Sequence, residues 1–140
     1  MISLRLVVDT NIVVSAALKP GGLQRTVLLL ALTKPARWYV TGAILQEYED
    51  VLARPELRIR RGLRRQLMQL IRSHTHSVNP SRAVHVAPDP EDNKFLECAD
   101  AARADYRLTG NQRHFPIYWK KTKVISSREF LTLVAPHLLA

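Results

Sequence analysis

Cysteine is almost absent from this sequence, since Cys98 is the only one. A lone cysteine forms no internal disulfide, which agrees with a reducing compartment. Long apolar runs are also absent, and none approaches the ~20 residues that a membrane-spanning helix needs. The first residues do not form a signal peptide, because Arg5 interrupts the apolar run and Asp9 follows at once. We therefore expect a cytoplasmic protein that does not associate with membranes.

The chain lacks internal repeats, low-complexity tracts and linkers, and residues 1–140 are expected to form one domain. Acidic residues are few, with 12 Asp and Glu against 21 Lys and Arg and a net charge of +9. Such a chain attracts polyanions, and most of the excess is arginine, whose planar fork binds phosphate through two hydrogen bonds. The favoured interpretation is contact with nucleic acid, while a solvated basic surface and an acidic protein partner are the alternatives.

Short apolar segments alternate with amphipathic ones along the chain. The expected strands cover residues 4–8, 37–40, 106–109 and 123–125, with residues 84–86 as a further candidate. The expected helices cover residues 24–33, 43–52 and 62–73, with two more beginning near residue 89 and at the capping-box sequence of residues 126–129. This order predicts an α/β fold with three α/β/α layers and a central, mostly parallel sheet. Sites in such sheets gather at the carboxyl ends of the strands.

Two acids occupy positions where this arrangement would place a site. Asp9 directly follows the first strand and would lie at the carboxyl edge of the sheet, although it could instead cap a helix that begins before Ile12. Glu47 lies three residues after Ile44 and four before Val51. It therefore shares the apolar face of its helix. An acid on a buried face needs a partner, and a metal ion is one candidate.

The region near residue 90 holds three more acids at the start of a helix. Asp89 is explained as the N-cap before Pro90, and acids in a first turn also favour the helix dipole. Asp92 lies one turn before Phe95 and so tends toward the apolar side. Asn111 follows the strand of residues 106–109 and mirrors the position of Asp9. Its amide oxygen can bind Mg²⁺ or a metal-linked water, although asparagine is also favoured in turns after glycine.

As a set, these residues predict a cation site. Clustered carboxylates repel one another, and a divalent cation removes that cost. For the same reason, we expect Asp9→Asn to leave the metal-free protein folded and even to stabilise it. Ligands that are all oxygen select Mg²⁺ or Mn²⁺ over zinc, and such ions on a basic protein suit phosphodiester hydrolysis.

Four segments in this order resemble the PIN-domain family and its toxin branch, the VapC-like ribonucleases of toxin–antitoxin pairs. They are residues 7–16 (VVDTNIVVSA), 45–55 (LQEYEDVLARP), 89–99 (DPEDNKFLECA) and 104–111 (ADYRLTGN). The resemblance spans nearly the whole chain. It implies a metal-dependent endoribonuclease with RNA as its substrate, a cognate antitoxin as its partner and a homodimer as its assembly.

Residue by residue, the resemblance places the family's acids on Asp9, Glu47 and Asp92. It implies that Asp9 and Asp92 hold the principal Mg²⁺ or Mn²⁺ ion, while Glu47 completes the cluster or orients the attacking water. The fourth acid of the family falls on Asn111, a neutral residue that weakens a second metal site or serves it as a neutral ligand. This departure favours the alternative function, a catalytically weak PIN-fold module that binds RNA or protein. Supporting positions near the cluster fall on Thr10, Asn11 and Thr109.

Arginines flank and line the helix expected at residues 62–73. Its apolar stripe should pack inward and consists of Leu63, Leu67, Leu70 and Ile71. The arginines that should then project outward, toward RNA or an acidic antitoxin segment, are Arg61, Arg64, Arg65 and Arg72. A solvated charged face is the alternative. His114 follows Asn111 closely and is a further candidate for substrate contact.

Overall fold

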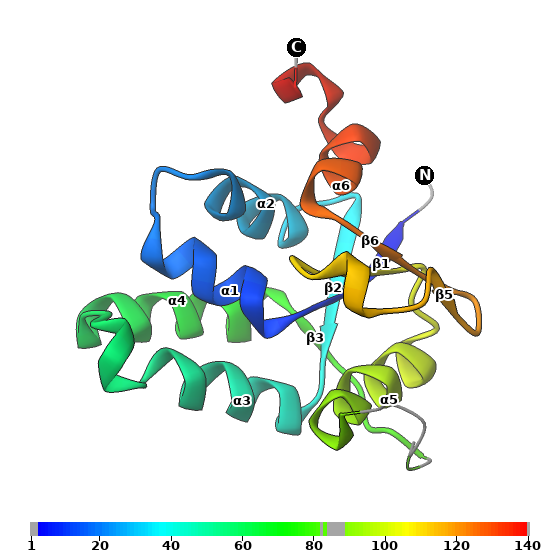
Figure 1. Cartoon of the computed structure of the whole chain (residues 1–140), viewed down its shortest axis with the longest axis horizontal. Helices are drawn as coiled ribbons and strands as arrows, with labels where there is room; N and C mark the ends of the chain where they lie inside the picture. Colours follow the sequence, from blue (N-terminus) through cyan, green and yellow to red (C-terminus); the bar gives the residue numbers. More distant parts are fainter. Residues whose placement is uncertain (1–2, 82, 84–88, 140) are drawn as a thin grey trace.

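The structure is a computed structural model, and it describes residues 3–81, 83 and 89–139 (Figure 1). Within these residues, six strands form one sheet in the order β3-β2-β1-β4-β6-β5. Their bounds are β1 (Leu4–Val8), β2 (Ala36–Val40), β3 (His76–Ser77), β4 (Tyr106–Leu108), β5 (Tyr118–Trp119) and β6 (Thr122–Ile125). Neighbouring strands run parallel except at one edge, where β5 pairs with β6 in the antiparallel sense.

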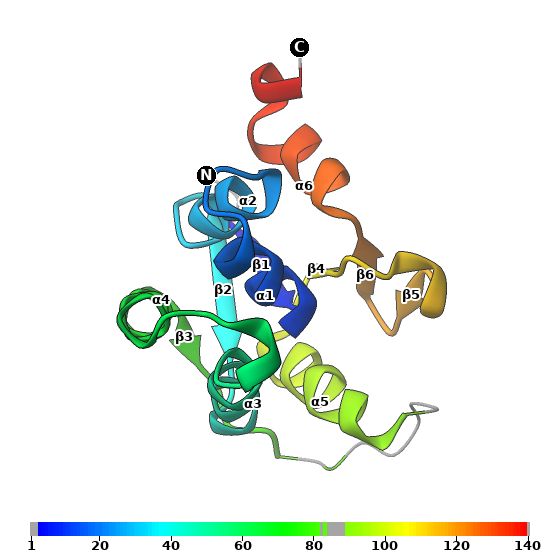
Figure 2. The ribbon, with the colours of Figure 1, turned by 60° about the vertical axis from the view of Figure 1, so that its left-hand side comes forward.

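Helices flank this sheet, as Figures 1 and 2 show. Their bounds are α1 (Thr10–Leu18), α2 (Leu23–Ala31), α3 (Gly42–Leu52), α4 (Arg61–His74), α5 (Asn93–Ala102) and α6 (Ser127–Val134). Short 3-10 turns add η1 (Pro55–Leu57), η2 (Pro90–Asp92), η3 (Gln112–His114) and η4 (Pro136–Leu139). The predicted α/β fold with a central, mostly parallel sheet is confirmed. A membrane-spanning helix is not found among the described residues, whose helices are too short or too polar for that purpose.

The elements form where the sequence pattern predicts them, for identifiable reasons. The central strand β1 is covered on both faces, so Leu6, Val7 and Val8 are all fully buried. On α4, Leu67 and Ile71 pack into the core while the basic positions around them face outward or lie half-buried. The start of α6 is a complete capping box, in which Ser126 and Glu129 satisfy each other's backbone N–H groups.

Several local features differ from the sequence prediction. A helix, α1, begins directly after Asp9, as the alternative role of Asp9 requires, although the apolar pattern does not predict it. The chain after residue 89 first makes the 3-10 turn η2, because Asp89 accepts a hydrogen bond from the Glu91 N–H, and the α-helix begins only at Asn93. Strands β3 and β5 have two residues each and are too short to produce an alternating pattern. The candidate strand at residues 84–86 lies outside the described residues.

The sheet brings two strand ends to the same edge. Val8, the last residue of β1, is in register with Leu108, the last residue of β4. The N–H of Asp9 continues this ladder by donating to the Leu108 carbonyl oxygen at 2.9 Å. Asp9 and the loop that follows β4 therefore lie side by side at the carboxyl edge, next to which α3 and α5 are in contact with each other (Figure 2).

The loop after β4 is tied to α6 by Gln112. Its side-chain amide donates to Glu129 Oε1 at 2.6 Å and to the Val124 carbonyl oxygen at 3.3 Å. Burial of Glu129 acts to raise its pKa, but hydrogen bonds from Gln112 and from Ser126 outweigh burial and hold the pKa below its ordinary value of 4.5. The charged form of Glu129 thus supports both the helix start and the loop.

We predict a pH-dependent loss of stability in Glu129→Gln. A carboxyl whose pKa is lowered by folding stabilises the fold above its unfolded pKa, and this contribution disappears as the pH falls through the folded pKa. The free energy of unfolding of Glu129→Gln should therefore lie below that of the parent at neutral pH and approach it in acid, as urea titrations at several pH values would measure. Glu56→Gln, at an exposed residue of η1, is the matched control. A loss at neutral pH no larger than that of the control would contradict this interpretation.

Candidate functional site

The carboxylate of Asp9 does not cap α1, although Asp9 occupies the N-cap position. It is buried and instead accepts a hydrogen bond from Arg107 Nε at 2.7 Å. Burial raises the pKa of Asp9, and the Arg107 guanidinium opposes that rise. The capping role considered for Asp9 is therefore not what its side chain performs.

The carboxylate of Asp92 meets the same guanidinium from the start of α5. Nη1 of Arg107 donates to Asp92 Oδ2 at 2.9 Å, and Nη2 donates to Asp92 Oδ1. This is the two-bonded fork typical of arginine with a carboxylate. Three of the four carboxylate oxygens of Asp9 and Asp92 thus accept from Arg107. A single side chain joins the two acids that the sequence predicts as the principal metal ligands.

Arg107 is itself almost completely enclosed, with a side chain that is 2% exposed. Its guanidinium carbon lies 5.2 Å from the centroid of the Phe95 ring and 4.3 Å from that of Phe115. Burial acts to lower the pKa of Arg107, but its bonds to Asp92 and Asp9 outweigh burial and raise the pKa. The guanidinium stays charged, held by carboxylates at its edge and by aromatic rings near its face.

Helix α3 brings Glu47 to the same carboxyl edge of the sheet as Asp9 and Asp92. We call the part of this edge that these three acids form the rim. The hydroxyl of the neighbouring Tyr48 is buried and donates to the carbonyl oxygen of Val8, which fixes α3 against the end of β1. Glu47 then accepts from the Thr10 hydroxyl through Oε2 and from Lys94 Nζ at 2.7 Å through Oε1. Burial acts to lower the pKa of Lys94, but its bonds to Glu47 and to another acid outweigh burial and raise the pKa. Glu47 therefore also has a cationic partner from the chain itself.

The loop after β4 completes the rim. The N–H of Gly110 donates to Asn11 Oδ1 at 3.0 Å, which ties the loop to α1. Thr109 is buried, accepts from the Asn111 N–H at 3.1 Å and gives Asp9 a side-chain hydrogen bond. The side chain of Asn111 is exposed. Thr10, Asn11 and Thr109 thus make contacts at the rim, while Asn111 lies at its solvent side.

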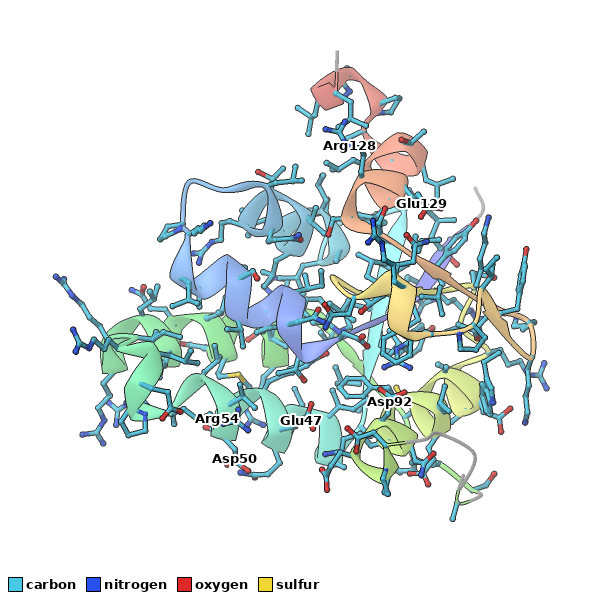
Figure 3. The ribbon with its side chains drawn as sticks, viewed as in Figure 1. Glu47, Asp50, Arg54, Asp92, Arg128 and Glu129 are labelled. Carbon is cyan, nitrogen blue, oxygen red and sulfur yellow. The ribbon has the colours of Figure 1, made fainter. Side chains whose placement is uncertain are left out.

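Two hollows meet at Asn111, which lines both. A groove of about 1060 Å³ lies along α1 and α3, and its lining includes Thr10, Glu47 and Arg54. A smaller cleft of about 420 Å³ lies between the loop after β4 and the start of α6, and its lining includes Arg113 and Arg128. Figure 3 shows Arg54 just beyond α3, Glu47 and Asp92 near the middle of the molecule, and Arg128 on α6. Of the three acids, Glu47 lines the groove, whereas Asp9 and Asp92 line neither hollow. The charged residues that line the groove are the acids Glu47, Asp50, Asp89 and Glu91 and the cations Arg54 and Lys94.

The arginines predicted on the α4 face lie away from this rim. Arg61 and Arg65 are exposed, Arg64 is half-buried, and none of them lines either hollow. Arg72, on the same helix, is paired with Glu49 at 2.8 Å. The side chain of His114 lies outside the part of the chain that the structure describes. Binding of RNA or of a partner by these residues stays a prediction.

Arg107 and Lys94 are not predicted from the sequence. The available signal for Arg107 was a charged residue at the centre of a short apolar strand, a place where charge requires a buried partner. Lys94 lies within one helical turn of three acids, Glu91, Asp92 and Glu97, and looks like an ordinary surface residue. The sequence does not reveal that Arg107 contacts Asp9 or that Lys94 contacts Glu47, because each partner is dozens of residues away.

The oxygen donors of Asp9, Glu47 and Asp92 suit Mg²⁺ or Mn²⁺ by their chemistry. In the described part of the chain, however, no three His, Cys, Asp or Glu side chains are arranged so that they could hold a metal ion. Arg107 and Lys94 instead bind oxygens of these three acids. A divalent cation between Asp9 and Asp92 would meet the positive charge of Arg107 there.

Comparison with known proteins identifies the family. Residues 5–113 match the PIN domain. This chain belongs to the PIN-domain family. The family is one of nucleases, and its members typically use divalent metal ions. The chain is also similar to an uncharacterized protein of Methanocaldococcus jannaschii, with 27% identity over 106 residues that cover 74% of this chain and 68% of the relative.

The Arg107 contacts reverse the expected effect of Asp9→Asn on stability. Asp9→Asn avoids the cost of burying a charge, which raises the pKa of Asp9, but it leaves the buried Arg107 guanidinium without one of its two charged partners, and we expect this loss to dominate. Removing one partner of a buried ion pair costs roughly 3 kcal/mol, and we predict a loss of that size in urea unfolding without added metal. Asp100→Asn, which breaks the exposed pair with Lys120, should change stability by no more than about 0.5 kcal/mol. An Asp9→Asn protein as stable as its parent would show that repulsion among the acids dominates.

Proposed function

We propose that this PIN-domain protein is an endoribonuclease that acts on RNA at the rim formed by Asp9, Glu47 and Asp92. The observation that carries the proposal is convergence: acids from the end of β1, from α3 and from the start of α5 meet at one carboxyl edge. Packing of the core does not explain three acids at this edge, because each of them can be buried only with a cationic or hydroxyl partner. Membership in a family of nucleases agrees with this reading.

The hollows on either side of Asn111 offer a path for a single RNA strand. Arg54 at one end and Arg113 with Arg128 at the other can neutralise phosphates, and all three are exposed. Asn111 lies between them, where an exposed amide can hydrogen-bond to a sugar, a base or a bound water. Glu47, oriented by Thr10, faces this path from α3. A strand lying along the hollows would pass the acids with its phosphates held by cations.

Asp9 and Asp92 would hold the Mg²⁺ or Mn²⁺ ion that we propose as the cofactor, and Glu47 lies beside them. Such an ion supplies an activated water and stabilises charge on the phosphate. The chain's own part is to fix the acids: Thr109 and the β-ladder position Asp9, while the turn capped by Asp89 positions Asp92. Thr10 fixes Glu47.

The toxin role, the cognate antitoxin and the homodimer, which the sequence resemblance implies, belong to this proposal as well. Arg61 and Arg65 are the exposed candidates on α4 for an acidic antitoxin segment, since they lie away from the hollows. A second function is favoured by a specific observation, namely the occupation of Asp9 and Asp92 by Arg107. It is a PIN-fold module that binds RNA with little or no cleavage.

Cleavage of single-stranded RNA in the presence of Mn²⁺ tests the main proposal. We predict that the parent cleaves, that chelator abolishes cleavage, and that Asp9→Asn lowers the rate by orders of magnitude. The assay is run where circular dichroism shows Asp9→Asn to be folded, with Asp100→Asn as the matched control. Cleavage that survives in Asp9→Asn or in chelator would refute the proposed mechanism. Binding without cleavage at any Mn²⁺ concentration would favour the second function.

RNA binding separates the rim from the α4 face. Each phosphate contact on a single strand contributes about 0.7 to the slope of log affinity against log salt. We predict that the double variant Arg113→Gln and Arg128→Gln binds more weakly, with a slope that flattens by about 1.4. Its control, Arg61→Gln with Arg65→Gln, removes the same charge from α4 and should bind RNA like the parent. The opposite result would place the RNA on α4 and contradict the path along the hollows.

A further inference from the structure

Arg107 occupies a place where an arginine is unexpected. It is the middle residue of β4, a strand that lies between β1 and β6, and its neighbours across the sheet are the buried residues Val7 and Val124. An apolar side chain would satisfy the packing of a strand covered in this way. A guanidinium buried there is stable only when its charge and its N–H groups are matched by partners.

The partners that Arg107 finds are the acids of the rim. Its Nε, Nη1 and Nη2 all donate to carboxylate oxygens of Asp9 and Asp92, and no other acid is needed to neutralise it. The rings of Phe95 and Phe115 restrict its movement. Asp9 is buried and the Asp92 side chain is only 17% exposed, so little water screens the contact.

These contacts are in direct conflict with a divalent cation at the same acids. A cation bound by Asp9 and Asp92 would take oxygens that already accept from Arg107, and it would lie against a fixed positive charge. Each carboxylate oxygen can accept more than one partner, so the conflict lies in the guanidinium filling the space between the two acids and repelling a second cation there. The affinity for the ion is therefore reduced by the free energy needed to release the guanidinium.

We propose that Arg107 is a built-in competitor of the divalent cation, which keeps the acids of the rim closed to metal until the guanidinium is displaced. The proposal rests on the proposed function only in taking Asp9 and Asp92 as the metal ligands. It assigns Arg107 a regulatory role: the protein binds Mn²⁺ weakly at rest, and whatever draws Arg107 away from the acids opens the site.

Calorimetric titration with Mn²⁺ tests this directly, without RNA. Arg107→Met keeps a long, flexible side chain against Phe95 and Phe115 but frees Asp9 and Asp92, so Mn²⁺ affinity should rise by about tenfold or more over the parent. Arg72→Met is the matched control, because it removes the same charge from an exposed pair on α4. Its affinity should equal that of the parent. An Arg107→Met protein that binds Mn²⁺ no more tightly than the parent would overturn the proposal.

A second variant covers the case in which Arg107→Met does not fold. Arg107→Lys keeps the buried charge but replaces the planar fork by a single ammonium, which cannot hold both carboxylates in the same way. We expect Mn²⁺ affinity between those of the parent and a freed site, and a larger rise of the Tm with Mn²⁺ than in the parent. A Tm of the parent that already rises as steeply as that of Arg107→Lys would refute the competition.

RNA cleavage distinguishes this proposal from the proposed function. If Arg107→Met binds Mn²⁺ more tightly while neither it nor the parent cleaves RNA, Arg107 is the competitor and the ribonuclease proposal fails. If the parent cleaves RNA and Arg107→Met shows unchanged Mn²⁺ affinity, the ribonuclease stands and the competition is refuted. If both proposals hold, Arg107→Met cleaves at Mn²⁺ concentrations that leave the parent inactive.

Discussion

The bond between one buried guanidinium and two carboxylates organises this molecule. Arg107 lies in the sheet, Asp9 at the end of the neighbouring strand and Asp92 at the start of α5, so their contacts join three segments that are far apart in sequence. Two buried or half-buried acids would otherwise repel each other at the edge of the sheet. The guanidinium neutralises this repulsion in the metal-free protein. A divalent ion is expected to neutralise it in a nuclease of this family. The rest of the rim follows the same rule, because Lys94 accompanies Glu47.

This arrangement connects stability and activity. The acids that would serve chemistry also contribute to the fold through Arg107, so they are satisfied before any ion arrives. Opening the site costs the free energy of these contacts, and the ion has to supply it. A nuclease built in this way is inactive at low metal concentration. If the Arg107 contacts are strong enough to keep the ion out altogether, the same fold serves only as a binding module. The two candidate functions are thus the ends of one scale, set by the strength of the Arg107 contacts.

Much of the structure could be predicted from local patterns. The apolar strand that ends before Asp9 predicts its place at the carboxyl edge. The helix face that Glu47 shares with Ile44 indicates that Glu47 is partly buried. The capping box of Ser126 and Glu129 is confirmed, because it depends on residues within one helical turn. The α4 stripe is confirmed for Leu67 and Ile71, which are buried, while Leu63 and Leu70 are half-buried. Asp89 caps its turn as expected, although the turn is a 3-10 helix before the α-helix begins.

What the sequence could not supply is the identity of the partners. An acid on a buried face needs a cationic partner. The sequence alone does not show whether that partner is a metal ion or an arginine on a distant strand. Arg107 stands in a strand of three residues, too short for alternation to show which way its side chain faces. The cationic residues beside the hollows, Arg113 and Arg128, were missed for the same reason: they meet Asn111 only through the packing of the loop after β4 against α6.

The central claim is that Arg107 and a divalent ion exclude each other at Asp9 and Asp92. Anomalous X-ray diffraction from crystals of the parent protein, grown without metal and then soaked in increasing concentrations of Mn²⁺, tests it most directly. The account predicts that any manganese peak between the two carboxylates appears together with a guanidinium that has left them. A manganese ion bound to both Asp9 and Asp92, with Arg107 still donating to the same oxygens, would contradict it.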